Sequence, residues 1–146
     1  MIKVLFVCHG NICRSPLAEF VFKDIVKKNG CEDEFFIASA ATSREEIGNP
    51  PYPPVRRLLN EKGIPFDAHK CARQVTAKDY EEFDYIICMD SNNMRNIRRI
   101  ISEDPKGKIS TLLNRDVADP WYTGDFDTTY RDVLFGCTEL FENLTK

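Results

Sequence analysis

KVLFVCHGNICRSPLAEF, residues 3–20, joins an apolar, β-branched run to a short turn and to a segment with helical apolar spacing. The run from Lys3 to Cys8 has the length and composition of a buried strand. Ser15 and Pro16 are suited to the cap and the first turn of a helix, and Leu17 begins the apolar spacing of that helix. The stretch therefore predicts a strand, a tight connection and a helix in immediate succession.

The same alternation continues along the chain. Further strands are predicted at residues 35–39, 84–89 and 109–113. Further helices are predicted after a proline-rich connector at 50–54, after the strand at 84–89, and after a polar loop at 119–127. Because strands that alternate with helices form right-handed crossovers, the pattern indicates an α/β fold in which helices cover both faces of a parallel sheet. With 146 residues, the chain is expected to form one domain over residues 1–146.

The composition excludes several classes of protein. Apolar residues make up 42% of the chain and charged residues 29%, as in ordinary soluble domains, and the net charge of −3 argues against nucleic acid as a general partner. No apolar run approaches the ~20 residues that a membrane span needs. Residues 1–7 lack a basic region and a cleavage site, so they indicate a strand and not a signal peptide. We expect a cytoplasmic protein with neither nucleic acid nor membrane as a partner.

The cysteines predict thiols, not disulfides or a metal site. Six cysteines are present, at positions 8, 13, 31, 71, 88 and 137. No Cys-x-x-Cys pair occurs, and His9 and His69 do not complete a zinc-binding spacing. A domain of this length forms a core without disulfide support. We therefore expect reduced thiols and no metal.

The turn between the first strand and the first helix is the expected binding site. Ligands of a doubly wound sheet bind beyond the carboxyl ends of the strands, where residues Cys8 to Ser15 lie. A tight turn there directs successive backbone N–H groups, and the N-terminus of the helix, at one point, which favours an anion. Gly10 and Asn11 tolerate the left-handed backbone that such a turn requires. The segment lacks the Gly-Lys-Ser/Thr of a Walker loop.

Cys8, Arg14 and Ser15 can supply chemistry in this turn. The electrostatic field that attracts an anion also favours the thiolate form of a cysteine, which is a strong nucleophile. The planar fork of Arg14 can bind two phosphate oxygens and the charge that develops on them during transfer. The hydroxyl of Ser15 can donate to the sulfur of Cys8. The pattern predicts nucleophilic catalysis on a phosphate ester.

Residues Val7 to Pro16 resemble the signature of the low-molecular-weight protein tyrosine phosphatases, including its position near the N-terminus. Further stretches match in the order of that family: SAATS at 39–43, GNPP at 48–51, ARQ at 72–74, CMD at 88–90 and DPWY at 119–122. The resemblance implies a flavodoxin-like, four-stranded parallel sheet with helices on both faces. It also implies a two-step reaction without metal or cofactor, in which phosphotyrosine in proteins is hydrolysed through a cysteinyl phosphate.

The resemblance assigns roles to individual residues. Cys8 attacks phosphorus, Arg14 clamps the phosphate, and Asp119 protonates the leaving phenolate and later activates water. Taken alone, Asp119 is only a common turn starter before proline, but the reaction needs an acid that the first loop does not contain. The remaining substrate-binding residues are expected to be His9, Gly10, Asn11, Ile12, Cys13, Ser15, Trp121 and Tyr122. Phosphotyrosine-containing proteins would be the partners, and inorganic phosphate the product and an inhibitor.

The resemblance further implies that Asn11, Ser15 and Ser39 form a hydrogen-bonded network that supports the loop. In the family a histidine usually joins this network three residues before the arginine of Ala-Arg-Gln. This chain has Lys70 there, and His69 is displaced by one position and is not assigned to the site. Glu45 stands where many relatives place an aromatic residue, so it forms either an acidic rim or a solvated loop charge.

Two other enzyme classes and one class without activity are alternatives to this function. Arsenate reductases share the loop but need two further cysteines close together near the third strand, whereas Cys71 and Cys88 are 17 positions apart. Protein-arginine phosphatases carry threonine in place of Ile12, and a branched apolar residue suits a phenyl ring better than a guanidinium. A phosphate-binding module without activity would be expected to lack the nucleophile, the arginine or the acid, all of which are present.

Overall fold

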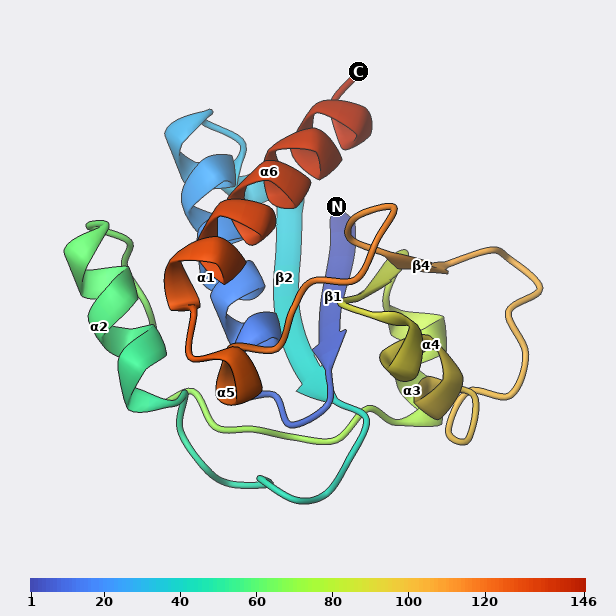
Figure 1. Ribbon diagram of the computed structural model, residues 1–146. Helices are drawn as coiled ribbons and strands as arrows, with labels where there is room; N and C mark the ends of the chain where they lie inside the picture. Colours follow the sequence, from blue (N-terminus) through green and yellow to red (C-terminus); the bar gives the residue numbers. More distant parts are fainter.

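A computed structural model describes residues 1–146 and contains one four-stranded parallel sheet, with strand order β2-β1-β3-β4 (Figure 1). The strands are β1 (Ile2–Cys8), β2 (Phe35–Ala41), β3 (Tyr85–Cys88) and β4 (Ile109–Thr111). Cys8 is paired with Ala41, and Val7 with Cys88. Three strands therefore end at the same edge of the sheet, and the predicted α/β class with four parallel strands is confirmed.

Helices cover both faces of the sheet (Figure 1). They are α1 (Arg14–Lys28), α2 (Pro53–Glu61), α3 (Ala77–Glu82), α4 (Ser91–Ile97), α5 (Pro120–Thr123) and α6 (Phe126–Leu144), with a short 3-10 helix at Glu32–Glu34. Helices α1, α2 and α6 lie on one side, and α3 and α4 lie on the other. None of these helices combines the length and the apolar character that crossing a membrane would require.

Strand β1 contributes to a separate core on each face, because alternate side chains of a strand point in opposite directions. Phe6 faces α1, where its ring makes an edge contact with the ring of Phe22 at 5.6 Å between centroids. Leu5 and Val7 face the other way and pack with Ile97 of α4. Burial on both faces explains why the strand is continuously apolar and does not alternate with polar residues.

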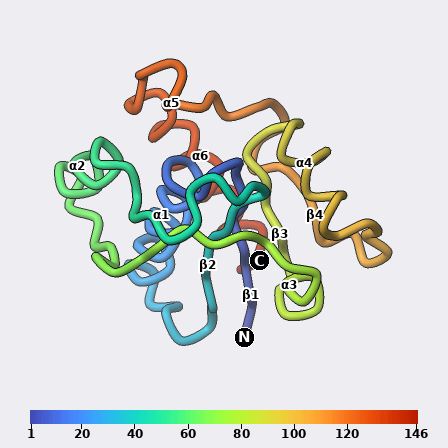
Figure 2. Tube along the Cα trace, turned by 90° about the horizontal axis from the view of Figure 1, so that it is seen from below, coloured from blue at the N-terminus to red at the C-terminus, as the bar shows by residue number.

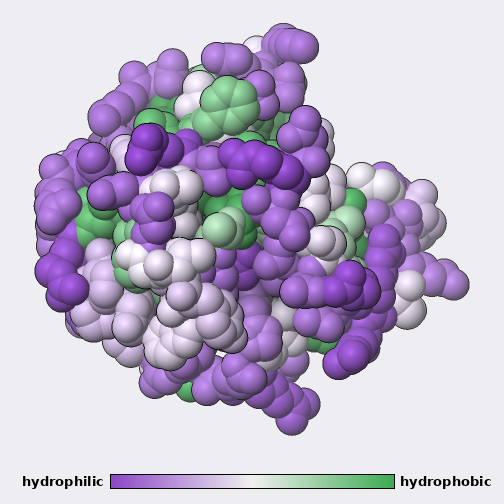
Figure 3. All heavy atoms as spheres, in the orientation of Figure 1, coloured by the Kyte–Doolittle hydropathy of each residue, from purple (hydrophilic) through white to green (hydrophobic).

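The surface in the view of Figure 3 is mostly hydrophilic, with apolar side chains in scattered spots.

Two connecting segments cross the end of the sheet where β1 and β2 finish (Figure 2). They are the segment after β2 and the segment before α3. A parallel bridge pairs Ala41, the last residue of β2, with Gln74 in the second of these segments. Farther along, the N–H of Ala72 donates to the carbonyl of Asn49 at 2.8 Å. These contacts hold residues distant in sequence beside the turn that follows β1.

Several helix boundaries differ from those predicted. Helix α1 begins at Arg14, and no side chain caps it, because the hydroxyl of Ser15 contacts the Cys8 sulfur instead. The loop expected at 119–127 contains α5, whose N-terminal N–H at Trp121 is capped by Asp119 at 3.0 Å. Helix α4 ends at Ile97, and a turn follows it. The short helices α3 and α5 were not predicted, because each has too few residues to show an apolar period.

Gly136 offers a test of how α6 packs. A Cβ atom at this position would lie 2.5 Å from Cγ of Leu112. In an open helix, alanine is more stable than glycine by roughly 1 kcal/mol, but overpacking costs about 1–3 kcal/mol. We expect Gly136→Ala to lower the free energy of unfolding by about 1 kcal/mol in urea denaturation. Glu139→Ala, an exposed change on the same helix, is the control. Stabilisation by Gly136→Ala would contradict this packing.

Candidate active site

The turn after β1 surrounds the sulfur of Cys8 with donors. The backbone N–H groups of Asn11 and Ser15 donate to Cys8 Sγ at 3.3 and 3.4 Å, and the Ser15 hydroxyl lies 3.0 Å from the same sulfur. Asn11 adopts a φ of 60°, the one positive φ outside glycine. This conformation curls the turn so that its N–H groups point inward, as in other anion-binding loops.

Side chains behind the turn form a hydrogen-bonded cluster. The amide nitrogen of Asn11 donates to Ser15 Oγ at 2.7 Å and to Ser39 Oγ at 2.9 Å. All three residues are buried. The structure thus brings together the three residues that the resemblance placed in a network, and it does so away from the solvent side of the turn.

Arg14 lies at the start of α1, and only 2% of its surface is exposed. Its Nη1 donates to Asp90 Oδ2 at 2.6 Å and to the carbonyl of Val117 at 2.8 Å. Burial alone would lower the pKa of Arg14, but Cys8, Asp90 and Asp119 act in the opposite direction and leave it raised. The guanidinium is therefore a fixed positive charge beside the Cys8 sulfur.

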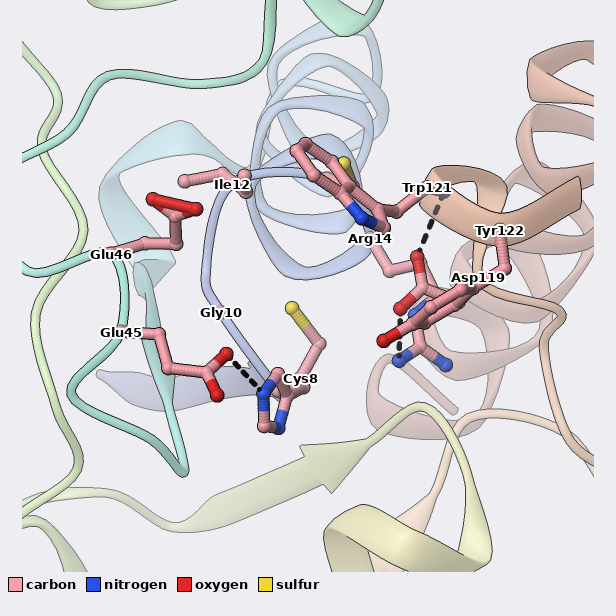
Figure 4. A pocket seen from close by; sticks show the side chains of 11 residues that line it. Cys8, Gly10, Ile12, Arg14, Glu45, Glu46, Asp119, Trp121 and Tyr122 are labelled. Carbon is pink, nitrogen blue, oxygen red and sulfur yellow. Dashed lines mark hydrogen bonds and ion pairs between the residues drawn. The ribbon is translucent and has the colours of Figure 1, made fainter. Parts of the chain in front are cut away.

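Asp119 reaches the site from the segment between β4 and α5. One carboxylate oxygen accepts from the backbone N–H of Trp121 at 3.0 Å and so caps α5. The other oxygen accepts from Nη2 of Arg14 at 3.4 Å. The two contacts hold the carboxylate at the wall of the pocket, facing the side on which Cys8 lies (Figure 4).

These groups converge on one pocket of about 120 Å³ (Figure 4). Its lining consists of Cys8, His9, Gly10, Ile12, Cys13, Arg14, Glu45, Glu46, Asp119, Trp121 and Tyr122. Asn11, Ser15 and Ser39 were also predicted for the site, but their side chains lie behind the turn and do not line the pocket. Tyr122 is 82% exposed and Trp121 is 51% exposed. Ile12 and these two aromatic residues provide the apolar part of the wall.

Glu45 occupies the rim of the pocket and contacts the turn. Its carboxylate lies 2.7 Å from Nε2 of His9, and both side chains are largely exposed. Glu46, which was not predicted for the site, also lines the pocket. His69 is exposed, and its backbone N–H donates to Asp67, outside the pocket. The rim is thus acidic, and His69 does not line the pocket.

The other buried cysteines do not compete with Cys8 as nucleophiles. Burial, followed by the charge of Cys8, raises the pKa of Cys13 to about 12. Burial likewise raises the pKa of Cys88 to about 12, with a further contribution from Asp90, and raises that of Cys137. These thiols remain protonated near neutral pH. No group of three or more His, Cys, Asp or Glu side chains is placed to hold a metal ion.

Three side-chain contacts of the site were not predicted from the sequence. Asp90 ends the CMD stretch and accepts a hydrogen bond from Arg14, but no local sequence pattern indicated this partner. Glu19 accepts from the Ser39 hydroxyl at 2.6 Å. Lys70 donates to Asn11 Oδ1 at 3.2 Å. The one available signal was the presence of Lys70 where the resemblance led us to expect histidine.

The fold and this pocket define an α/β protein with an anion-binding loop between its first strand and its first helix. The family model described as "Low molecular weight phosphotyrosine protein phosphatase" matches residues 3–146. The chain is 40% identical to the low molecular weight protein-tyrosine-phosphatase YfkJ of Bacillus subtilis, with 100% of this chain and 97% of that protein covered. It is also 40% identical to the human low molecular weight phosphotyrosine protein phosphatase, with 96% and 94% covered.

Solved structures agree with the sequence comparison. The crystal structure of YfkJ superposes with a TM-score of 0.93 at 41% identity and covers 99% of this chain and 94% of that one. The low molecular weight protein tyrosine phosphatase of Streptococcus pyogenes gives a TM-score of 0.94 at 44% identity, with 100% and 95% covered. The chain therefore belongs to the low molecular weight protein tyrosine phosphatase family.

Proposed function

We propose that this chain hydrolyses phosphotyrosine in proteins through a cysteinyl-phosphate intermediate, with Cys8 as nucleophile, Arg14 as phosphate clamp and Asp119 as general acid and base. The observation that carries the proposal is the convergence of these three side chains, two from the turn after β1 and one from the segment before α5, on one pocket. An anion in the pocket would meet the N–H groups of the turn and the charge of Arg14. Membership of the phosphatase family supports the same substrate.

In the first step, the Cys8 sulfur attacks phosphorus and an S–P bond forms. The bond between phosphorus and the tyrosyl oxygen breaks, and its electron pair stays on that oxygen, which takes a proton from Asp119. The N–H groups of the turn and the guanidinium of Arg14 bind the non-bridging oxygens, where charge develops. The capping contact with Trp121 holds Asp119 toward the leaving group.

In the second step, water attacks the phosphorus of the cysteinyl phosphate. Asp119, now a carboxylate, accepts a proton from that water, and the S–P bond breaks with its electron pair left on sulfur. The Ser15 hydroxyl, 3.0 Å from the sulfur, stabilises the departing thiolate. Inorganic phosphate is the product, and it inhibits because it binds the same donors.

The shape of the pocket supports an aryl phosphate. Cys8 is buried at the floor, whereas Trp121 and Tyr122 stand exposed at the mouth. A phenyl ring can span this depth between apolar walls, but the short side chain of phosphoserine would hold its phosphate too near the peptide backbone. Ile12 favours a phenyl ring over the guanidinium of phosphoarginine. A cytoplasmic location stays a prediction.

Replacement of the nucleophile tests the proposal. Cys8→Ser leaves Arg14 and the N–H donors in place, but a serine hydroxyl does not ionise near neutral pH. We expect hydrolysis of phosphotyrosine peptides to fall to the background rate, while vanadate still binds in calorimetry. Cys71→Ser, a change at an exposed thiol, is the matched control and should retain full activity. Substantial turnover by Cys8→Ser would reject the nucleophile assignment.

A second variant tests the acid. Asp119→Asn keeps an oxygen that can cap α5 but cannot supply a proton. Phenols with a pKa near 10 leave poorly without one, whereas nitrophenolate leaves with little help. In single-turnover experiments, Asp119→Asn should slow phenyl phosphate cleavage by ~10²–10⁴-fold and p-nitrophenyl phosphate cleavage much less.

The control for this experiment is Asp127→Asn, a change at an exposed residue of the same region. It should leave both single-turnover rates unchanged. Equal slowing of the two substrates by Asp119→Asn would show that Asp119 does not donate the proton.

A further inference from the structure

The proposed acid stands at the start of α5, the shortest of the α-helices. Helix α5 contains four residues, Pro120–Thr123, and a helix of that length is not stable without tertiary contacts. The Asp119 carboxylate caps this helix at the N–H of Trp121, and its contact with Nη2 of Arg14 is long, at 3.4 Å. The distance between Asp119 and the Cys8 sulfur therefore depends on what holds α5 in place.

Hydrogen bonds anchor the segment that precedes α5. The backbone N–H of Val117 donates to the carbonyl of Met89, just after β3, at 2.9 Å. The hydroxyl of Thr129 on α6 donates to the carbonyl of Ala118 at 3.1 Å. These contacts fix residues 117 and 118, but they do not reach the helix itself. A pair of aromatic side chains links α5 to the turn after β1.

The ring of Tyr52 contacts α5 and the start of α6. Its centroid lies 4.8 Å from that of Trp121, with an interplanar angle of 54°. The same ring lies 6.1 Å from that of Phe126, the first residue of α6, with an interplanar angle of 27°. Aromatic pairs at such separations attract one another. Because the indole of Trp121 is half exposed, the packing on its buried part decides its position, and Tyr52 supplies an aromatic part of that packing.

The backbone of Tyr52 is tied to the turn after β1. Its N–H donates to the carbonyl of Ile12 at 2.8 Å, and Ile12 belongs to that turn and lines the pocket. The ψ angle of Tyr52 is 137°, in the extended range that a following proline, here Pro53, favours. Its carbonyl accepts from the N–H of Val55 at 2.9 Å, where α2 begins. The ring therefore projects from a fixed backbone, and one residue joins the turn that holds Cys8 to the helix that Asp119 caps.

We propose that Tyr52 is a positioning residue for proton transfer, which holds Trp121, and through it the Asp119 carboxylate, at a fixed distance from the turn after β1. This inference rests on the proposed role of Asp119 as the acid. Tyr52 does not line the pocket, so it acts through Trp121 and not on the substrate. Because a misplacement of about 1 Å can cost a reaction ~10²-fold, the contact matters most for a leaving group that needs a proton.

The fluorescence of Trp121 reports its surroundings without requiring turnover, because the chain contains one tryptophan. Tyr52→Leu removes the ring but keeps an apolar side chain and the backbone N–H. We expect the emission of this variant to shift to longer wavelength and its quenching by acrylamide to increase, since the indole loses packing and gains contact with water. Tyr52→Phe, which keeps the ring, should have the wild-type spectrum.

Single-turnover kinetics measure the effect on proton transfer. Tyr52→Leu should slow phenyl phosphate cleavage by ~10–10²-fold and p-nitrophenyl phosphate cleavage much less, because nitrophenolate leaves with little help. Tyr52→Phe should cleave phenyl phosphate at close to the wild-type rate. The matched control is Tyr85→Leu, the same change at an exposed tyrosine that begins β3, at the end of the strand away from the pocket. It should leave both rates and the emission spectrum unchanged.

A double-mutant cycle tests whether Tyr52 acts through the acid. In an Asp119→Asn background, Tyr52→Leu should have little further effect on phenyl phosphate cleavage, and full additivity would overturn the proposal. Equal slowing of the two substrates by Tyr52→Leu would overturn it as well, because the residue would then support the turn and not the acid. So would rates or an emission spectrum equal to those of the wild type. If Tyr52→Leu does not fold, Tyr52→Met is measured against the same criteria.

These outcomes are distinct from a failure of the proposed function. If Asp119 were not the acid, Asp119→Asn would slow the two substrates equally, whatever the Tyr52 variants show. If only the role of Tyr52 is wrong, Asp119→Asn still slows phenyl phosphate cleavage far more than p-nitrophenyl phosphate cleavage, whereas Tyr52→Leu cleaves the two substrates in the wild-type ratio.

Discussion

Asn11 adopts a left-handed φ of 60°, which costs an ordinary L-residue roughly 1–2 kcal/mol. Asparagine tolerates this conformation better than most residues, and here its amide is held by Lys70, Ser15 and Ser39. The strained residue lies at the centre of the turn, so its backbone sets where the N–H groups point. The arrangement of donors around Cys8, and with it the anion site, depends on this constraint.

The rest of the structure supports that turn from both sides. Strand β1 is buried on both faces, so Cys8 cannot shift along the sheet without disturbing two cores. On the far side, Arg14 is tied to Asp90 after β3 and to Val117 after β4. The nucleophile and the phosphate clamp are thus anchored to different strand ends, which gives the pocket a fixed width. Asp119 comes from the segment before α5, and its side chain is held in place because it caps that helix.

Much of this could be predicted from the sequence, because the deciding features are local. One contiguous stretch contains the apolar run of β1, the turn and the start of α1. This stretch predicted the fold and placed Cys8 and Arg14 in an anion-binding turn. Contacts between distant residues left no local pattern: Lys70 lies 59 positions from Asn11, and Asp90 lies 76 positions from Arg14. Ser15 was predicted to be a helix cap from its local chemistry, but its hydroxyl instead contacts the Cys8 sulfur and accepts a hydrogen bond from the Asn11 amide.

The central claim is that phosphate passes through a covalent bond to Cys8. In the most direct measurement, the Asp119→Asn variant is mixed with p-nitrophenyl phosphate and the reaction is stopped by rapid denaturation. The phosphorylated residue is then located by peptide mass spectrometry. Because this leaving group needs little acid while hydrolysis of the intermediate needs the base, the account predicts that phosphate accumulates on the peptide that contains Cys8. Release of nitrophenolate with phosphate on no residue, or on a residue other than Cys8, would contradict the account.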